Sequence, residues 1–369
     1  MTIRVGLIGA NGHTRGPTTT EARWGGRVHG AVFSTLPECE LVAVCTTRRE
    51  TAEIAAQNLG AKRAFVDYRE MIEWDDIDLV SVAVRVDLHH PMVLAAIDAG
   101  KHVYCEWPLA VNTIEAAEIL DRAQKTGIHH AVGLQSHGSP GILYLRDLIA
   151  QGDIGRILMV NMIFFWNAAR VGRHAYVPYV LSAEGGGNAL SILGGHSINA
   201  LTKIFGDLNV LSADVDTLIP EETLADTKET LKITSHDSVN IIGRFVSGAM
   251  LTAGVSWITD PKLGWRMYAY GTEGCLEATS DGMMQMSPIT IRRGSAGTDS
   301  FEPIAIPDKY YWTPEFDLGT KQFNVGQIVR RFVQGIEQGR AVSPNFEDAL
   351  ALHQLVEKIE LSSLEHRQS

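Results

Sequence analysis

The sequence has no apolar run that reaches the ~20 residues a membrane-spanning helix requires. It also has no basic block. Its 32 Lys and Arg residues are outnumbered by 43 Asp and Glu residues, which gives a formal net charge of -11. Nucleic-acid binding needs clustered Lys and Arg to neutralise phosphates, so this balance excludes a nucleic-acid partner. A hydrophobic share of 45% is enough for a large core, which excludes a disordered chain.

Cysteine is scarce, and the four residues form neither a C-x-x-C pair nor a zinc-like spacing: Cys39, Cys45, Cys105 and Cys275. This excludes a secreted disulfide scaffold and favours a reducing, cytoplasmic setting. The adjacent pairs His89-His90 and His129-His130 point to different faces of a strand or helix and would clamp a metal poorly. We therefore expect no metal site.

Residues 1–135 alternate short apolar runs with segments of helical pattern. The expected strands, rich in Val and Ile, are Ile3–Ile8, Leu41–Cys45, Leu79–Val84, His102–Glu106 and His130–Leu134. Their lack of polar alternation is typical of parallel strands buried on both faces. Three helical segments end at or just before a glycine, as at a C-cap: Gly60, Gly100 and Gly127. The alternation predicts an α/β chain that begins with a Rossmann dinucleotide-binding domain.

Residues 136–369 predict a second α/β domain with an open, mostly antiparallel sheet. Its longer expected strands, some alternating with period two, are Ile157–Trp166, Val239–Val246, Ala249–Ile258 and Met267–Tyr270. Its expected helices are Pro140–Ala150, Leu190–Phe205, Gln322–Gln338 and Phe346–Leu364. The last two could instead pack back on the first domain. The acidic stretch Glu221–Glu229 is interpreted as a solvated loop or helix face.

A glycine-rich turn, Gly9-Ala10-Asn11-Gly12, follows the first strand, where a dinucleotide fold places its phosphate loop. Glycine lets backbone N–H groups approach a pyrophosphate closely. The strict G-x-G-x-x-G pattern is absent, because Asn11 occupies the place of the second glycine. Cofactor binding by Gly9, Asn11 and Gly12 is the preferred interpretation, and a simple tight turn is the alternative.

The end of the second strand indicates which cofactor is bound. NAD-specific folds usually carry Asp or Glu there, whereas this strand ends in Thr46-Thr47-Arg48-Arg49. Thr hydroxyls and Arg guanidinium groups suit a 2′-phosphate. NADP, bound by Thr46, Arg48 and Arg49, is therefore preferred to NAD. The alternative is a solvated basic start to the next helix.

The segment VAVRVDLHHPMVLAAIDAGKHVYCEWPLAVN resembles the glucose–fructose oxidoreductase, inositol dehydrogenase and rhizopine catabolism (Gfo/Idh/MocA) family. The resemblance covers nearly the whole chain and continues through VGLQSHGSPGILYLRDLIAQGDIG, Gly185–Gly187 and FVQGIEQGRAVSPNFEDALAL. Within the family, the chain is most similar to the branch of the yeast galactose-pathway repressor. The shared features are Trp24-Gly25 with His29, Val84 to His89, E-W in place of E-K, and Leu134 to Pro140.

The resemblance implies cofactor contacts from a set of residues spread along the first domain: Trp24, Val84, His89, Glu106, Trp107 and Gln135. In family dehydrogenases the lysine of E-K-P assists proton transfer from the substrate hydroxyl. Trp107 replaces this lysine and cannot pass a proton, since an indole N–H is a donor only. It could instead stack on the nicotinamide or on the apolar face of a sugar.

The second catalytic motif of the family, L-x-D-x-G-x-H, corresponds to residues 190–196 here, with Ile192 in place of the aspartate. Only His196 remains of the usual Lys, Asp and His, and an imidazole can pass a proton near neutral pH. Tyr176 and Tyr179 lie where relatives place substrate contacts and could serve as the acid or base. The alternatives are a hydrogen-bonded core histidine and ordinary aromatic packing.

Two functions follow from the resemblance. The first is an NADP- or NAD-dependent oxidoreductase that transfers hydride at a carbinol or carbonyl carbon of a sugar-like or other hydroxylated small molecule. The second is a nucleotide-sensing regulatory protein without turnover, which the loss of both Lys and Asp favours. Because the second-domain sheet often mediates assembly in this family, a homodimer or homotetramer is implied.

Overall fold

The computed structural model describes residues 2–10, 24–167 and 180–368. The chain forms two compact units: Met1–Leu134 with Thr313–His353, and Gln135–Trp312 with Gln354–Ser369. The sequence placed a boundary after residue 135 and left open where the closing helices pack. Residues 313–353 belong to the first unit. Within the described parts of the chain, no helix has the length and apolar character needed to cross a membrane.

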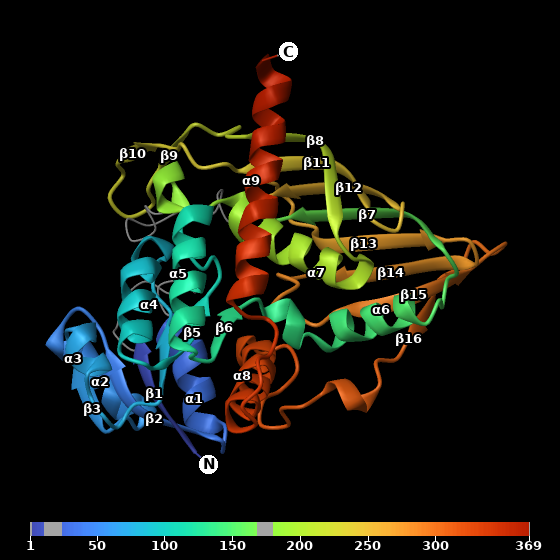
Figure 1. The fold of residues 1–369 in the computed structure, drawn as a ribbon. Coiled ribbons are helices and arrows are strands. Elements are labelled where there is room, and N and C mark those ends of the chain that lie inside the picture. The colour runs from blue at the N-terminus through green and yellow to red at the C-terminus, as the bar shows by residue number, and fades with distance from the viewer. Residues whose placement is uncertain (1, 11–23, 168–179, 369) are drawn as a thin grey trace. The chain divides into compact units, whose positions relative to one another are not determined.

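The first unit contains a six-stranded sheet with the order β3-β2-β1-β4-β5-β6, and all its pairings are parallel (Figure 1). The strands are β1 (Ile3–Ile8), β2 (Cys39–Cys45), β3 (Arg63–Phe65), β4 (Leu79–Val82), β5 (His102–Glu106) and β6 (His130–Gly133). The order reverses between β1 and β4. This is the Rossmann arrangement, in which ligands bind at the carboxyl ends of the strands beside the reversal.

Helices connect these strands and complete the first unit. They are the π-helix η2 (Gly25–Gly30), α1 (Ala31–Thr35), α2 (Arg49–Leu59), α3 (Tyr68–Ile72), the short 3₁₀ helix η3 (Val86–Leu88), α4 (His89–Asp98), α5 (Thr113–Thr126) and α8 (Lys321–Glu337). Local sequence sets the ends of α5: Asn112 accepts from the Glu115 N–H at the start, and Gly127 takes a left-handed conformation after the end. The helix α9 (Phe346–Gln368) begins in this unit.

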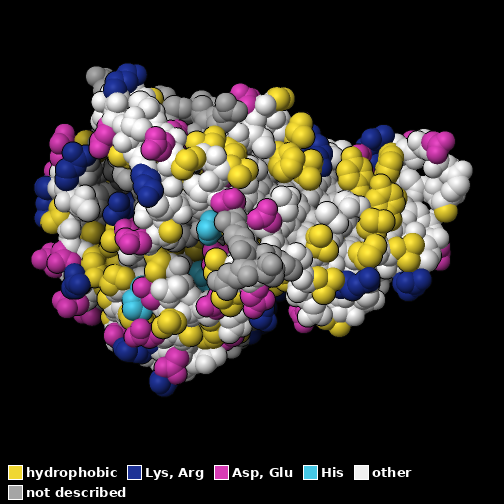
Figure 2. Space-filling model, turned by 90° about the horizontal axis from the view of Figure 1, so that it is seen from above, with side chains coloured by type: hydrophobic (Ala, Val, Ile, Leu, Met, Phe, Trp, Pro, Cys, Tyr) yellow, Lys and Arg dark blue, Asp and Glu magenta, His cyan; other side chains and the backbone are white. Residues whose placement is uncertain are grey.

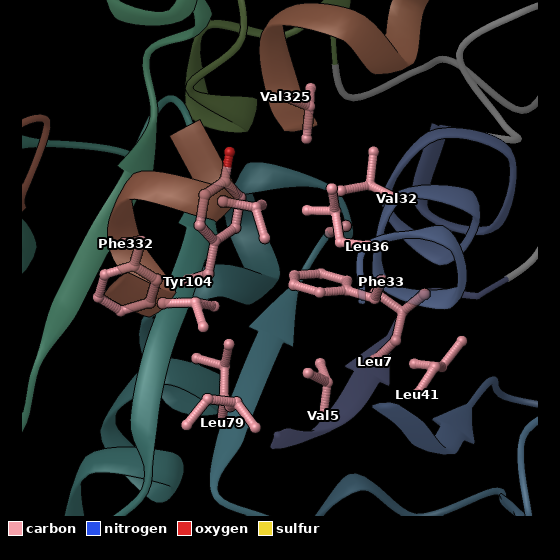
Figure 3. Packing of buried hydrophobic residues seen from close by; sticks show 14 of the residues in the cluster. Val5, Leu7, Val32, Phe33, Leu36, Leu41, Leu79, Tyr104, Val325 and Phe332 are labelled. Atoms are coloured by element: carbon pink, nitrogen blue, oxygen red, sulfur yellow. The ribbon is translucent and has the colours of Figure 1, made fainter. Parts of the chain in front are cut away.

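Helix α8 is bound to the first unit by both apolar and ionic contacts. Figure 3 shows the packed core, in which Phe33 of α1 and Phe332 of α8 flank Tyr104 of β5. The buried Arg330 of α8 pairs with Glu38 and with Glu315, each through a nitrogen–oxygen distance of 2.8 Å. The hydrogen bonds from this guanidinium lower the pKa of Glu315. These contacts explain why a segment so late in the sequence belongs to the first unit.

The second unit contains an eight-stranded sheet with the order β16-β15-β14-β13-β7-β12-β11-β8 (Figure 1). Its strands are β7 (Ile157–Phe165), β8 (Leu208–Asp216), β11 (Ser238–Phe245), β12 (Met250–Ser256), β13 (Gly264–Gly271), β14 (Gly274–Ser280), β15 (Thr290–Ser295) and β16 (Glu302–Ile304). Only the β7–β12 pairing is parallel among the described strands of this sheet. The predicted open and mostly antiparallel sheet is therefore confirmed.

Helices α6 (Pro140–Ala150) and α7 (Gly195–Phe205) cover one face of this sheet (Figure 1). Short helical turns precede them, namely η4 (Gln135–Gly138), η6 (Ala183–Gly185) and the π-helix η7 (Ala189–Gly194), and η8 (Asp308–Tyr310) comes later. Residues 221–229 were predicted to be a solvated loop or helix face, and residues 224–229 do form a loop. The first three residues of this segment instead form β9 (Glu221–Thr223), which pairs antiparallel with β10 (Thr230–Lys232).

Candidate functional site

The end of β1 approaches two other segments so closely that only glycine fits. Gly9 has φ +95°, and a Cβ on it would lie 2.3 Å from the Ala83 carbonyl oxygen. A Cβ on Gly25, the first residue of η2, would lie 2.1 Å from the Gly9 carbonyl oxygen. We call this convergence of Gly9, Gly25 and Ala83 the glycine cradle. It leaves bare backbone at the carboxyl edge of the sheet, as a pyrophosphate site requires.

The remaining predicted residues of the phosphate loop are only partly placed. Asn11 and Gly12 lie outside the described residues. Trp24 is the N-cap residue of η2, and its ring centroid is 6.1 Å from that of His29. It therefore sits at the entry to the helix that follows the loop.

At the end of β2, the predicted donors for a 2′-phosphate differ in what they contact. Thr46 is buried, and its hydroxyl contacts the Thr51 hydroxyl at 2.6 Å and donates to the Arg48 carbonyl at 3.0 Å. Arg49 donates to the Ala64 carbonyl. Arg48 itself is the exposed N-cap residue of α2, and its guanidinium forms no ion pair with any described residue. Thr46 thus stabilises the start of α2, and Arg48 is the donor that remains available to an anion.

Glu106 ends β5 at the same edge of the sheet and is 8% exposed. Its Oε1 lies 2.5 Å from Nε2 of His29, which is fully buried in η2. The sequence singled out Glu106 but gave His29 no role. Only the contact across 77 residues of sequence shows that the two side chains act together.

His89 holds the loop that carries Trp107. Its Nδ1 lies 2.8 Å from the Pro108 carbonyl oxygen, and its Nε2 lies 3.1 Å from that of Val84. Burial lowers the pKa of His89, and a neutral ring can donate to one of these acceptors at a time. Trp107 is 6% exposed, and its ring centroid is 4.6 Å from that of His353. Burial also lowers the pKa of His353 to about 4, so the neighbour of the indole is uncharged at neutral pH.

In the second unit, His196 lies in the first turn of α7 and is 4% exposed. The sequence predicted one helix over 190–205, but the structure has the π-helix η7 followed by α7. Asn188 begins η7 in a capping box with Ser191. Because π-helical turns are rare and often occur at functional sites, this irregularity immediately before His196 fits a role in chemistry.

A buried polar cluster accompanies His196. Asn199 lies three residues further along α7, on the same helix face. Its Oδ1 accepts from Nε2 of His137 at 2.9 Å and from the Ser136 hydroxyl at 3.3 Å. Gln135, which begins η4, is buried beside these residues in the chain. Sequence reasoning missed His137 and Asn199, although the spacing of Asn199 from His196 was a usable signal.

Two predicted acid–base candidates, Tyr176 and Tyr179, lie outside the described residues. Among the residues that are described, no three His, Cys, Asp or Glu side chains gather as a metal site would require. The groups that can be assessed are therefore the cradle, Arg48, the His29–Glu106 pair and Trp107 in the first unit, with the cluster at His196 in the second.

Comparisons with known proteins agree with this arrangement. A family model described as an oxidoreductase family with an NAD-binding Rossmann fold matches residues 3–134, and the model of the GFO/IDH/MocA C-terminal domain matches residues 142–277. The chain is 30% identical over 239 residues to dehydrogenase aclE of Aspergillus oryzae, spanning 62% of this chain and 62% of that enzyme. It is 24% identical over 374 residues to levoglucosan dehydrogenase of Pseudarthrobacter phenanthrenivorans, covering 94% and 92%.

A solved structure of a super-repressor mutant of Gal80p from Saccharomyces cerevisiae shares the fold with a TM-score of 0.85. It is 19% identical and covers 99% of this chain and 97% of that one. At this level of identity the likeness concerns the fold alone.

Proposed function

The chain belongs to the GFO/IDH/MocA family of NAD-binding oxidoreductases, and we propose that it transfers hydride between NADP or NAD and a carbinol or carbonyl carbon of a sugar-like molecule. The glycine cradle carries this proposal, because Gly9 and Gly25 let three backbone segments approach more closely than any Cβ would allow, at the edge of the sheet where this fold binds a pyrophosphate. The levoglucosan, inositol and 1,5-anhydro-D-fructose named for related enzymes support a sugar or polyol as substrate.

In the proposed reaction, Gly9 and η2 hold the pyrophosphate, Arg48 binds the adenosine half, and Glu106 with Trp107 orients the nicotinamide half. The bound nicotinamide supplies the hydride acceptor or donor. During oxidation the substrate carbinol loses hydride from carbon and a proton from oxygen, and His196 takes the proton. Trp107 positions the reacting rings, because its indole cannot take that proton. Tyr176 and Tyr179 are further candidates for the acid–base role.

The proposal is tested by mixing the protein with NAD⁺ or NADP⁺ and a panel of sugars and polyols, while the absorbance of the reduced nicotinamide is recorded. We expect reduction with at least one panel member. A protein that binds neither nucleotide contradicts the proposal.

We further propose that NADP is preferred to NAD. Arg48→Ala is expected to weaken NADPH binding by about tenfold or more, because a hydrogen bond to a charged group is lost, and to leave NADH binding within about twofold. Calorimetric titration with each nucleotide measures both constants. Arg63→Ala is the matched control, since this exposed arginine of β3 lies over the rings of Phe65 and Trp74. Equal losses for NADPH and NADH in the Arg48 variant would refute the preference.

The second candidate function is nucleotide sensing without turnover. Ile192 and Trp107 replace the aspartate and lysine of the family motifs, and Gal80p shares the fold. Submicromolar NADH binding combined with no turnover of any panel member would favour this candidate. Turnover of a panel member would exclude it.

We also propose that a second copy of the chain covers the open face of the eight-stranded sheet, giving a homodimer or homotetramer. Met250 pairs with Met159, and Met159 pairs with Tyr270, so these three exposed side chains lie side by side across β12, β7 and β13. Ile242 and Leu211 on β11 and β8 are exposed as well. Figure 2 shows hydrophobic side chains gathered at the right of its view.

Met159→Asp is expected to shift the assembly toward monomer, because it places a charge in the middle of the apolar face. Sedimentation velocity of the wild type and the variant measures the change. A monomeric wild type would contradict the proposal.

The four unpaired cysteines support the further proposal of a reducing, cytoplasmic setting.

A further inference from the structure

The Glu106 carboxylate is held from two sides inside the first unit. On one side, His29 Nε2 lies 2.5 Å from Oε1, and since a carboxylate only accepts, Nε2 carries the shared proton. On the other side is Gly133 of β6, where a Cβ would lie 2.7 Å from Oε2 and 2.8 Å from Oε1. The carboxylate therefore lies directly over the backbone of β6 with little freedom to turn.

Three other titratable groups lie near the pair. Tyr104 lies beside His29, with ring centroids 5.4 Å apart, but its hydroxyl makes no hydrogen bond. Burial raises the pKa of Tyr104 and of Cys105 well above their ordinary values, and the charge of Glu106 raises both further. Burial lowers the pKa of His89, another titratable neighbour. Among these neighbours, His29 is the group that donates to the carboxylate.

The His29–Glu106 pair lies where it can affect cofactor binding. Strand β5 belongs to the half of the sheet, β4 to β6, that takes the second nucleotide of a dinucleotide, while β2 with Arg48 belongs to the other half. His29 comes from η2, whose first residue, Gly25, forms the cradle. The pair thus connects the helix that begins at the cradle with the strand end that faces the nicotinamide half.

We propose that His29 is a positioning residue for the cofactor: it holds the Glu106 carboxylate as an acceptor for the nicotinamide riboside. This inference rests on the proposed function, because it assumes that the site takes NADP or NAD. Trp107 adjoins Glu106 in the chain, so a fixed carboxylate also fixes the start of the loop that carries the indole.

Two substitutions at one position form a matched test. Glutamine can place an amide N–H near the position of the imidazole Nε2, whereas the shorter asparagine cannot reach Glu106. In calorimetric titrations, His29→Asn is expected to weaken NADH binding by about tenfold or more, and His29→Gln to stay within about threefold of the wild type. ADP, which lacks the nicotinamide riboside, is expected to bind all three proteins equally.

Tyr104→Phe is the control, because it removes a hydroxyl without a hydrogen bond from the same aromatic cluster. We expect NADH binding to be unchanged. Three results would overturn the proposal: unchanged NADH affinity in His29→Asn, equal losses for NADH and ADP, or an equal NADH loss in Tyr104→Phe. The last two would show that His29 merely supports the cradle or the core.

If His29→Asn does not fold, His29→Leu combined with Glu106→Gln replaces it, since this double variant leaves no unpaired charge buried. It is expected to bind NADH like Glu106→Gln alone, which itself binds more weakly than the wild type. A further tenfold loss in the double variant, or full affinity in Glu106→Gln, overturns the proposal. A wild type that binds neither NADH nor NADPH is a different result, because it overturns the proposed function as well.

Discussion

Gly25→Ala is expected to abolish measurable NADH binding and to lower the free energy of unfolding by about 3 kcal/mol. The added Cβ would lie 2.1 Å from the Gly9 carbonyl oxygen. The backbone fixes the positions of both atoms, so no side-chain rotation can relieve the contact. Gly9 cannot retreat easily, because it packs closely against Ala83. A Cβ on Gly9 would lie 2.3 Å from the Ala83 carbonyl oxygen. The η2 helix must therefore move away from β1, and the cradle opens. Chemical denaturation and NADH titration measure the two effects.

Gly60→Ala is the matched control for this prediction. Gly60 differs from Gly25 in having a positive φ, +72°, and nothing lies within 4 Å of the added Cβ. The cost is then the backbone conformation alone, about 1 kcal/mol, and NADH affinity is expected to stay within about twofold of the wild type. If Gly25→Ala bound NADH as well as Gly60→Ala does, the close approach of Gly9 and Gly25 would not form the cofactor site.

In the first unit, strong local patterns predicted the strands well. The bounds of β1 and β5 agree with the predicted runs Ile3–Ile8 and His102–Glu106, because both are mostly apolar and largely buried on each face. Strand β3 was missed. It has three residues and begins with an exposed arginine, so neither length nor periodicity distinguishes it from a loop.

In the second unit, the prediction found fewer of the strands. Strand β8 alternates exposed and buried residues only irregularly and contains a register shift opposite β11, which breaks the period-two signal. The segment 190–205 was predicted as one helix because its apolar residues follow a helical period. The change from π-helical to α-helical turns at Gly195 depends on tertiary packing, which that period does not record.

For the candidate site, the sequence found residues at strand ends but not the partners that orient them. Glu106 and Trp107 followed from the family motif at the end of β5, whereas His29 and His353 come from segments far away in sequence. Thr46 was predicted to bind the cofactor, but in the structure its hydroxyl stabilises the start of α2. A hydroxyl three residues before a helix can serve the helix or a ligand, and only the geometry shows which partners are within reach.

His196→Ala is expected to lower kcat by about 10²–10⁴-fold on any substrate that the protein turns over, because the group that receives the hydroxyl proton is lost. NADH affinity is expected to stay within about twofold, since the proposed nucleotide contacts come from the first unit. His196→Gln should lose the same activity, because an amide can donate a hydrogen bond but cannot take a proton. Steady-state kinetics and NADH titration separate the two effects.

His236→Ala serves as the control for this last prediction, because it removes a partly exposed histidine from the same unit. Its kcat is expected to match the wild type. An intact rate in His196→Ala would show that the proton leaves by another route. Since Trp107 has no basic nitrogen, the buried His137 held by Asn199 would then be the next residue of this cluster to replace. A loss in His196→Ala that glutamine restores would instead assign His196 to substrate binding, because glutamine keeps a donor without the base.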